Sequence, residues 1–454
     1  MKTLSLSRLS LIVLLMVAIS ACDSSNLNED LQEGPEASLE TPLSRSSFKG
    51  AVYAMSNDFN ANTLVGYGRN SDGTLTHLGS YSTGGQGAAF DGGEGLDPLI
   101  SAYSVIIAGA NRYVLAVNAG SNTISALRIN RDFSLTLTDQ IYTRGVGPNS
   151  IAYHKGIVYV SNIDADGSFN GEPDQEGNLA GFRLTRSGKL SYINGSTRAL
   201  GNRPSAIQFS PDGDHLIVAS INAGSSALAS GSNDEMVVYR ANPGGLLSNQ
   251  PVSAAASTEV NNPEGRNLAS AIGFETVESG GNTYVVVTEA REFQADGSPP
   301  AFPQLQTGSI STWQLQNNGS LAPVQLDLLT GNSFTDGERT ACWIEFSPDN
   351  SYYWVSNALE STLSSFSFSN GTSTLINRVE AAGTPPGSDN PADAFANTDG
   401  WVDLWRSDDG KYLYQLYGLD GTIGVFEVTG SSLQLIEEVT GDLPEENTQG
   451  IVAF

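Results

Sequence analysis

The sequence of 454 residues predicts an all-β fold built from repeated small antiparallel sheets, and three observations lead to that prediction. A short hydrophobic strand that ends in a polar residue recurs seven times along the chain. Each copy is followed by a segment in which polar and apolar residues alternate, as they do in a half-buried strand. No segment longer than a turn or two has helical periodicity.

The N-terminal residues precede the repeats and are typical of an export signal. Lys2 and Arg8 precede an apolar run over residues 9–19. This run is too short to span a membrane as a helix. Ser20-Ala21-Cys22 then resembles a bacterial lipobox, which implies a signal peptide over residues 1–21 and lipidation of Cys22. The alternative is an ordinary signal peptide with a chance cysteine. Residues 22–47 are acidic and polar and predict a flexible tether.

The repeats begin after residue 47 and define the predicted blades. The seven hydrophobic strands end at Asn57, Asn118, Asn162, Asn222, Glu289, Asn357 and Gly418. Another short strand precedes six of them, and several of these pairs are joined by turns rich in Pro, Asp and Gly, at residues 210–213, 347–350 and 407–410. Leucine-bearing fourth strands follow turns such as the one at residues 72–75.

The missing partner of the first repeat lies at the other end of the chain. Residues 449–454 have the pattern of the absent inner strand, and pairing them with residues 51–57 would leave no open sheet edge. We therefore predict that residues 48–454 form a seven-bladed β-propeller of four-stranded antiparallel blades. The C-terminal strand closes the ring by pairing with the N-terminal blade.

Composition excludes several classes of function. The chain has 49 acidic and 22 basic side chains, a formal net charge of −27, which repels nucleic acid. Two cysteines cannot supply a disulfide scaffold. If Cys22 is lipidated, Cys342 is left alone and is expected to be a small buried apolar residue. We expect an envelope protein, on the periplasmic or cell-surface side, held by its lipid anchor and otherwise monomeric.

Long connections are predicted on one face of the propeller, and arginines gather at the channel mouth there. Arg203, Arg266 and Arg339 each precede an inner strand, and Glu289 and Arg291 end an adjacent second strand. A guanidinium group can bind a carboxylate or a phosphate through two parallel hydrogen bonds, so this pattern predicts an anion-binding site. The alternative is that these arginines neutralise acidic loops and cap carbonyls. Amides are expected around the same ring from Asn57, Asn118, Asn149, Asn162, Asn222 and Asn357.

Other candidate sites carry weaker signals. Asp164, Asp166 and Asp174 lie in an oxygen-rich loop that could hold calcium, although its glycine is not placed as in an EF-hand, and a solvated acidic loop is the alternative. His77, His154 and His215 are expected far apart, so no metal site and no serine–histidine couple is predicted. The tryptophans are expected between blades, with a sugar platform as the alternative.

Several repeats resemble a known family. The stretches Tyr159-Val160-Ser161-Asn162 and Ser121-Asn122-Thr123-Ile124, with SAIQFSPDG at 205–213 and WIEFSPDN at 343–350, resemble the lactonase-type seven-bladed propellers. That family includes bacterial 6-phosphogluconolactonases and fungal carboxymuconate lactonising enzymes, within the broader YVTN-repeat propellers. The resemblance covers roughly residues 48–454.

The resemblance implies arginine, glutamate and histidine at the channel mouth that bind an acidic lactone and move a proton. Arg203 is similar in position to a family arginine, whereas Pro148-Asn149 stands where the family tends to have histidine, and asparagine cannot titrate near neutrality. Glu289 and Arg203 are therefore the predicted catalytic residues, without a cofactor. The predicted substrate-binding residues are Arg266, Arg291, Arg339, Asn118, Asn149 and Asn162. The alternative function is a non-enzymatic module that binds a polysaccharide, a peptide or an envelope protein.

Overall fold

The computed structural model describes residues 48–88, 97–164, 177–200, 203–221, 236–255, 265–293, 305–384 and 398–454. These residues belong to one compact unit within Leu43–Phe454. The predicted signal peptide, Cys22 and the tether lie outside the described residues. None of the described segments forms a helix long and apolar enough to cross a membrane.

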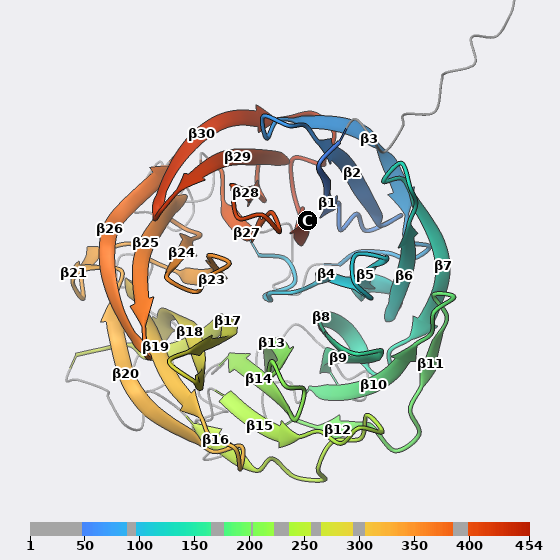
Figure 1. The fold of residues 1–454 in the computed structure, drawn as a ribbon, viewed down its shortest axis with the longest axis horizontal. Coiled ribbons are helices and arrows are strands. Elements are labelled where there is room, and N and C mark those ends of the chain that lie inside the picture. The colour runs from blue at the N-terminus through green and yellow to red at the C-terminus, as the bar shows by residue number, and fades with distance from the viewer. Residues whose placement is uncertain are drawn as a thin grey trace, which may run out of the picture. The chain divides into compact units, whose positions relative to one another are not determined.

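Seven antiparallel sheets stand around a central axis, each with four strands in its main order (Figure 1). Blade 1 contains β1 (Gly50–Met55), β2 (Thr63–Arg69), β3 (Leu75–Ser82) and the last strand, β31 (Ile451–Ala453). Blade 2 contains β4 (Val105–Ala108), β5 (Tyr113–Asn118), β6 (Thr123–Ile129) and β7 (Leu135–Tyr142). Blade 3 contains β8 (Val146–His154), β9 (Ile157–Asp164), β10 (Asn178–Leu184) and β11 (Leu190–Tyr192), with β12 (Arg198–Ala199) also paired to β10.

The other four blades repeat this order from the axis outward. Blade 4 contains β13 (Arg203–Phe209), β14 (His215–Ile221), β15 (Met236–Arg240) and β16 (Ser253–Ala255). Blade 5 contains β17 (Leu268–Ser279), β18 (Asn282–Phe293), β19 (Gln306–Leu315) and β20 (Leu321–Leu329). Blade 6 contains β23 (Ala341–Phe346), β24 (Tyr352–Asn357), β25 (Thr362–Ser369) and β26 (Thr372–Ala382). Blade 7 contains β27 (Trp401–Arg406), β28 (Tyr412–Tyr417), β29 (Thr422–Thr429) and β30 (Ser432–Val439).

Two short elements lie outside the blades. A small two-stranded sheet pairs β21 (Gly331–Ser333) with β22 (Asp336–Gly337), and a single turn of 3₁₀ helix, η1, spans Ala119–Ser121. The prediction of an all-β, seven-bladed propeller is confirmed.

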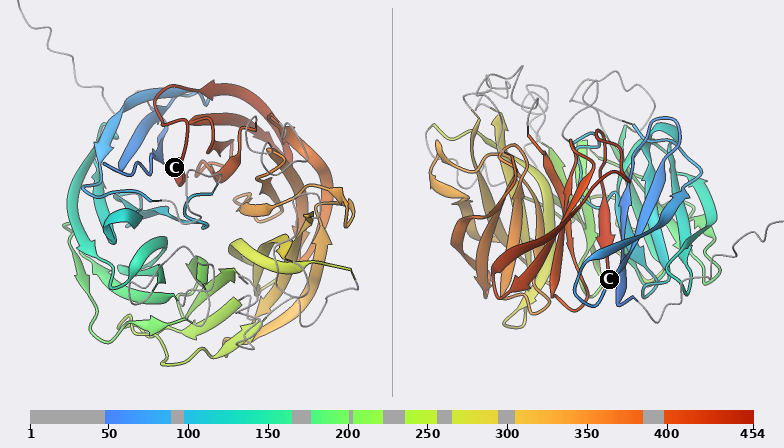
Figure 2. Two further views of the ribbon diagram at one scale, coloured as in Figure 1. Left: turned by 180° about the vertical axis from the view of Figure 1, so that it is seen from behind. Right: turned by 90° about the horizontal axis from the view of Figure 1, so that it is seen from above.

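The C-terminal strand closes the ring as predicted. β31 pairs antiparallel with β1 and places Val52 opposite Ala453, Tyr53 opposite Val452 and Ala54 opposite Ile451. The C-terminus therefore lies inside the ring beside β1, as Figures 1 and 2 show. The first blade consequently takes its innermost strand from the end of the chain.

The burial of each strand explains why the sequence forms it. The second strand of blade 2, β5, is buried along its whole length, whereas the outer strand β7 is buried only at its first residue and partly or fully exposed beyond it. Apolar residues therefore fill the space between blades, and polar residues face solvent at the rim. The hairpins between the first and second strands of the blades define what we call the turn face. Ser407 Oγ donates to Asp409 Oδ1 at 2.6 Å in one such turn, which Gly410 completes at φ +66°.

A segment that we call the central strap, residues 97–104, crosses the middle of the ring before β4 (Figure 1). Ala102 N donates to Ser205 O at 3.1 Å, Tyr103 Oη donates to Phe274 O at 2.5 Å, and Trp343 Nε1 donates to Ser101 O at 3.0 Å. The strap thus bonds to the inner strands of blades 4, 5 and 6.

Candidate functional site

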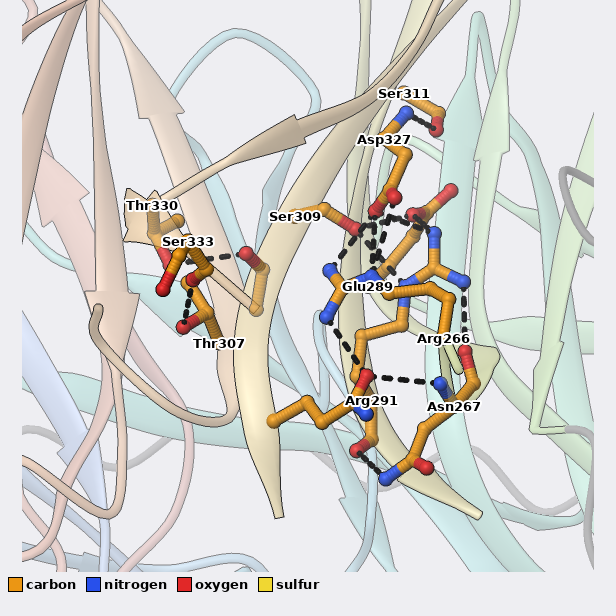
Figure 3. A network of polar contacts seen from close by, with 12 residues as sticks. Arg266, Asn267, Glu289, Arg291, Thr307, Ser309, Ser311, Asp327, Thr330 and Ser333 are labelled. Carbon is orange, nitrogen blue, oxygen red and sulfur yellow. Dashed lines mark hydrogen bonds and ion pairs between the residues drawn. The ribbon is translucent and has the colours of Figure 1, made fainter. Parts of the chain in front are cut away.

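Four charged side chains of blade 5 form a buried network (Figure 3). Arg291 Nη2 lies 2.6 Å from Glu289 Oε2 and 2.8 Å from Asp327 Oδ1, and Arg266 Nη2 lies 2.8 Å from the same Asp327 oxygen. None of these side chains is more than 4 % exposed. The network joins two of the predicted arginines to the predicted catalytic glutamate and to Asp327, which the sequence analysis did not single out.

Neutral groups complete the network. Ser309 Oγ donates to Glu289 Oε2 at 2.6 Å, Arg291 Nη1 donates to Asn267 O at 3.0 Å, and Arg266 Nη1 donates to Gln306 Oε1 at 3.2 Å. Burial lowers the pKa of Arg266, and its bonds to Asp327 oppose that effect. Two cations thus face two anions, so the network is balanced in charge. It fixes the strands of blade 5 to one another.

Two of the three arginines expected around one anion have carboxylate partners within the chain. Arg266 is committed to Asp327 inside blade 5. Arg339 lies before β23, and its Nε donates to Glu360 Oε1 in the connection between β24 and β25. The Arg339 and Glu360 side chains are 17 % and 18 % exposed, so this pair touches solvent. Arg203 is the first residue of β13 and is buried.

Five of the six predicted amides, those of Asn57, Asn118, Asn149, Asn162 and Asn357, lie in the described residues and are fully buried. Asn149 Nδ2 donates to Pro204 O at 2.7 Å, and Asn149 Oδ1 accepts from Ser161 Oγ at 2.8 Å. Asn118 Nδ2 donates to Ser125 Oγ, and Asn162 Nδ2 donates to Asn178 Oδ1, each at 2.8 Å. These amides join neighbouring strands at the ends of the blades. Their role in substrate binding stays a prediction, as do the catalytic roles of Glu289 and Arg203.

A second charged group lies on the inner strands, and sequence reasoning missed it. Glu275 is on β17, Glu345 on β23, and Arg406 on β27, with Arg406 Nε 3.0 Å from Glu345 Oε1. Glu275 is half-buried and the Arg406 side chain is 29 % exposed, so both reach solvent. We call these three residues the inner-wall cluster. The signal available in the sequence was a glutamate near the end of two consecutive inner strands.

The carboxyl groups of the inner strands hold their protons unusually strongly. Burial raises the pKa of Glu275 to about 7, and the charge of Arg406 opposes this shift. Burial, and then the charge of Glu275, raise the pKa of Glu345 well above its ordinary value. On β27, burial raises the pKa of Asp403 to about 7, although Gly450 N donates to its Oδ2 at 3.0 Å. Near neutrality, Glu275 is therefore poised between its acid and base forms.

The remaining predicted positions lie apart from these groups. Asp164 is buried at the end of β9, while Asp166, Asp174 and Asn222 lie outside the described residues. Cys342 is buried, as expected. The three histidines lie on β3, at the end of β8 and at the start of β14. In the part of the chain that the structure describes, no three His, Cys, Asp or Glu residues form a group that could hold a metal ion.

Comparisons with known proteins agree with this fold. Residues 291–444 match the family model described as Lactonase, 7-bladed beta-propeller. A putative 6-phosphogluconolactonase from Bacteroides uniformis ATCC 8492 has a similar structure, with 16 % identity, 89 % of this chain and 99 % of that chain covered, and a TM-score of 0.58. A second putative 6-phosphogluconolactonase, from Bacteroides fragilis NCTC 9343, has 13 % identity, coverage of 89 % and 97 %, and a TM-score of 0.54.

A third similar structure is the periplasmic gluconolactonase PpgL of Pseudomonas aeruginosa, with 19 % identity, coverage of 72 % and 82 %, and a TM-score of 0.52. A search of curated proteins gives no match. The resemblance to lactonase-type seven-bladed propellers is therefore confirmed, and at these identities the structural likeness concerns the fold.

Proposed function

We propose that the chain is a lactonase-type hydrolase that opens the ring of a sugar lactone at the inner-wall cluster. The observation that carries this proposal is the group formed by Glu275, Glu345 and Arg406 on neighbouring blades, of which Glu275 and Arg406 reach solvent. The family match over residues 291–444 includes two of the three. The similar structures are named as a putative 6-phosphogluconolactonase and a periplasmic gluconolactonase. These names support a sugar lactone as the substrate class.

The proposed reaction uses Glu275 as a general base. Its carboxylate takes a proton from water, and the resulting hydroxide attacks the lactone carbonyl carbon. Arg406 stabilises the negative charge that develops on the carbonyl oxygen, and Glu345 positions Arg406 through the contact of its Oε1 with Arg406 Nε. The tetrahedral species collapses by breaking the bond between the acyl carbon and the ring oxygen. That oxygen takes the proton back from Glu275, and the product is a hydroxy acid.

The arginines of the mouth suggested an anionic lactone, but most of them already have carboxylate partners. Arg266 and Arg291 bind Asp327, and Arg339 binds Glu360. The inner-wall cluster itself carries two carboxyl groups beside one guanidinium group. We therefore propose an uncharged sugar lactone in place of a phosphorylated one.

The test is hydrolysis of glucono-1,5-lactone and its 6-phosphate by the full chain in detergent, measured as acid release above the uncatalysed rate. We expect kcat/KM to fall as the pH drops below about 7, because protonation removes the base. Glu275→Gln should lower kcat by about 100-fold or more and abolish this acid limb. The matched control is Arg112→Gln, at an exposed arginine in the turn between β4 and β5, which should leave both unchanged.

Two other results would overturn parts of the proposal. If a folded wild-type chain hydrolyses neither lactone, nor any other member of a lactone panel, the molecule is a binding module for a polysaccharide, a peptide or an envelope partner. If Glu275→Gln keeps full activity while Arg203→Gln or Arg339→Gln loses it, and the phosphorylated lactone is preferred, the reaction occurs at the mouth.

We also propose that the chain is anchored in the bacterial envelope through a lipid on Cys22. The apolar run at residues 9–19 and the sequence Ser20-Ala21-Cys22 support this proposal. Cells that express the chain should incorporate a radiolabelled fatty acid into it, and Cys22→Ser should abolish the label. Labelling that persists in Cys22→Ser would contradict the proposed anchor.

A further inference from the structure

We propose that a cavity between blades 3 and 4, on the turn face, binds a small zwitterion of the amino-acid type. This site is separate from the inner-wall cluster and does not depend on the proposed lactonase activity. The cavity has a volume of about 320 Å³, which suits a small ligand. It is lined by His154, Lys155, Ile157, Arg183, Phe209 and the turns at residues 212–214 and 241–245.

Blade 3 supplies a cationic wall. Lys155 is exposed in the turn between β8 and β9, and no hydrogen bond or ion pair engages its ammonium group in the described chain. Arg183 Nη2 donates to Gly244 O at 2.7 Å, so this guanidinium group is held against the turn of blade 4. Its Nε and Nη1 atoms keep their donor capacity. A carboxylate group in the cavity would therefore meet two positive charges.

Blade 4 supplies an anionic wall. Asp212 Oδ1 accepts from Ser210 Oγ at 2.6 Å and from Asp214 N at 2.9 Å. These bonds engage Oδ1 of Asp212, and among the described residues neither Asp212 nor Asp214 forms an ion pair with Lys155 or Arg183. An ammonium group in the cavity would therefore meet two carboxylates.

In the corresponding turn of blade 7, the aspartate has a cationic partner from the chain itself. Asp409 Oδ1 accepts from Ser407 Oγ at 2.6 Å, as Asp212 Oδ1 accepts from Ser210. Asp409 Oδ2, however, lies 3.2 Å from Arg69 Nη1 of blade 1, so a residue of the chain itself neutralises it. Between blades 3 and 4 the two signs of charge stand on opposite walls without meeting. A zwitterion is the ligand that completes both walls at once.

Two aromatic rings without charge also line the cavity. The rings of His154 and Phe209 lie 5.8 Å apart, and a Cβ at Gly213 would stand 2.3 Å from His154 Nε2, so only glycine fits this turn. Burial, and then the charge of Lys155, lower the pKa of His154, while Asp212 and Asp214 oppose them. The imidazole is therefore neutral at pH 7, and it offers a surface for the carbon atoms of the ligand.

Calorimetric titration of the full chain with L-alanine, β-alanine and the dipeptide Ala-Ala at pH 7 tests the site. We expect at least one of these zwitterions to bind, and N-acetylalanine and alanine amide, which each lack one charge, to bind about tenfold more weakly or worse. Lys155→Gln and Asp214→Asn should each weaken binding of the zwitterion by about tenfold. The matched control is Lys189→Gln, at an exposed lysine near Asp139, which should bind as wild type does.

The proposal is overturned if the folded wild-type chain shows no binding of any of the three zwitterions up to about 10 mM. It is equally overturned if the singly charged analogues bind as tightly, or if neither variant differs from the control. Lactone hydrolysis measured on the same variants should be unchanged. The outcome for this cavity therefore remains separate from the outcome for the inner-wall cluster.

Discussion

Asp403 carries its carboxyl group in the interior of the innermost strand of blade 7. Burial raises its pKa to about 7, whereas an aspartate in the unfolded chain releases its proton near pH 4. Between these two values the folded chain holds a proton that the unfolded chain has lost. The free energy of unfolding must therefore fall as the pH rises through this window, and the whole contribution is absent above it.

We predict that Asp403→Asn weakens this pH dependence. One such proton changes the free energy of unfolding by about 1.4 kcal/mol per pH unit, and the variant lacks it. Asparagine keeps an oxygen that can accept from Gly450 N, so the fold is retained. Urea unfolding at pH 5, 6, 7 and 8 should show a shallower loss of stability than in the wild type. Glu275 and Glu345 shift in the same direction, so some slope remains.

The control for this experiment is Asp408→Asn, at an exposed aspartate in the turn that follows the same strand. It should leave the wild-type slope intact. A slope that is equally steep in Asp403→Asn and in the wild type would show that Asp403 does not hold its proton to neutral pH.

Asp327 is the residue on which the buried network of blade 5 depends. It accepts from both Arg266 and Arg291, whose side chains are fully buried. We predict that Asp327→Asn lowers the free energy of unfolding by about 3–5 kcal/mol, because two buried guanidinium groups then share a single carboxylate. Asp336→Asn, at an exposed partner of Arg378, should change it by less than about 1 kcal/mol. If Asp327→Asn and Asp336→Asn lower the free energy of unfolding equally in chemical denaturation, the structural role of the network is refuted.

The central strap is the element that joins distant blades. Gln449, just before β31, accepts from Leu99 N at 2.8 Å and donates to Asp97 Oδ1 at 2.6 Å and to Ser101 O at 2.8 Å. One buried side chain thus fixes both ends of the segment at residues 97–101. The strap has no regular strand or helix of its own, so these contacts replace the hydrogen bonds of a sheet.

We predict that Gln449→Ala loosens the strap before it affects the blades. The variant leaves buried strap groups without their partners, which should cost on the order of 2 kcal/mol or more. Hydrogen exchange at Leu99 should accelerate strongly, while exchange within β5 and β24 should change little. Gln314→Ala, at a partly exposed glutamine on β19, is the matched control. Uniform acceleration across all blades would mean that the strap is not a separate unit.

The whole molecule depends on the closure of its ring. β1 is hydrogen-bonded to β31 on one side and to β2 on the other, so removal of β31 exposes an unpaired edge at the centre of the fold. It also removes Val452 and Phe454, both buried in the core around blades 1 and 2. The last residues of the chain therefore stabilise its first blade directly.

We predict that a chain ending at Gly450 melts at a lower temperature and self-associates through the exposed edge of β1. Thermal unfolding and light scattering at several concentrations measure both effects. Glu445→Ala, an exposed substitution shortly before the closing strand, should behave as the wild type does. A truncated chain that stays monomeric with an unchanged melting temperature would contradict the closure as a source of stability.

Much of the fold was predictable because its signals are local. Each blade is specified by local signals, which are the alternation along its strands, its Ser-x-Asp hairpin and the repeat length. The strand pattern at residues 449–454 belongs to no later repeat, and only the first blade lacks an inner strand, so the pairing of the two follows. Glu289 and Arg291 were also correctly grouped, because they lie two residues apart on one strand and pair with each other.

The sequence by itself determined the number of blades, their strand order and the closing pair, since each follows from short-range patterns. Only the tertiary structure decided which charges meet. Asp327 lies in a bulge of β20 at φ +51°, and Glu275 follows a bulge in β17. A bulge shifts by one residue which side chains point to each face of the sheet, so the partners of Asp327 and Glu275 cannot be counted along the chain. The strap is likewise placed by contacts with residues hundreds of positions away.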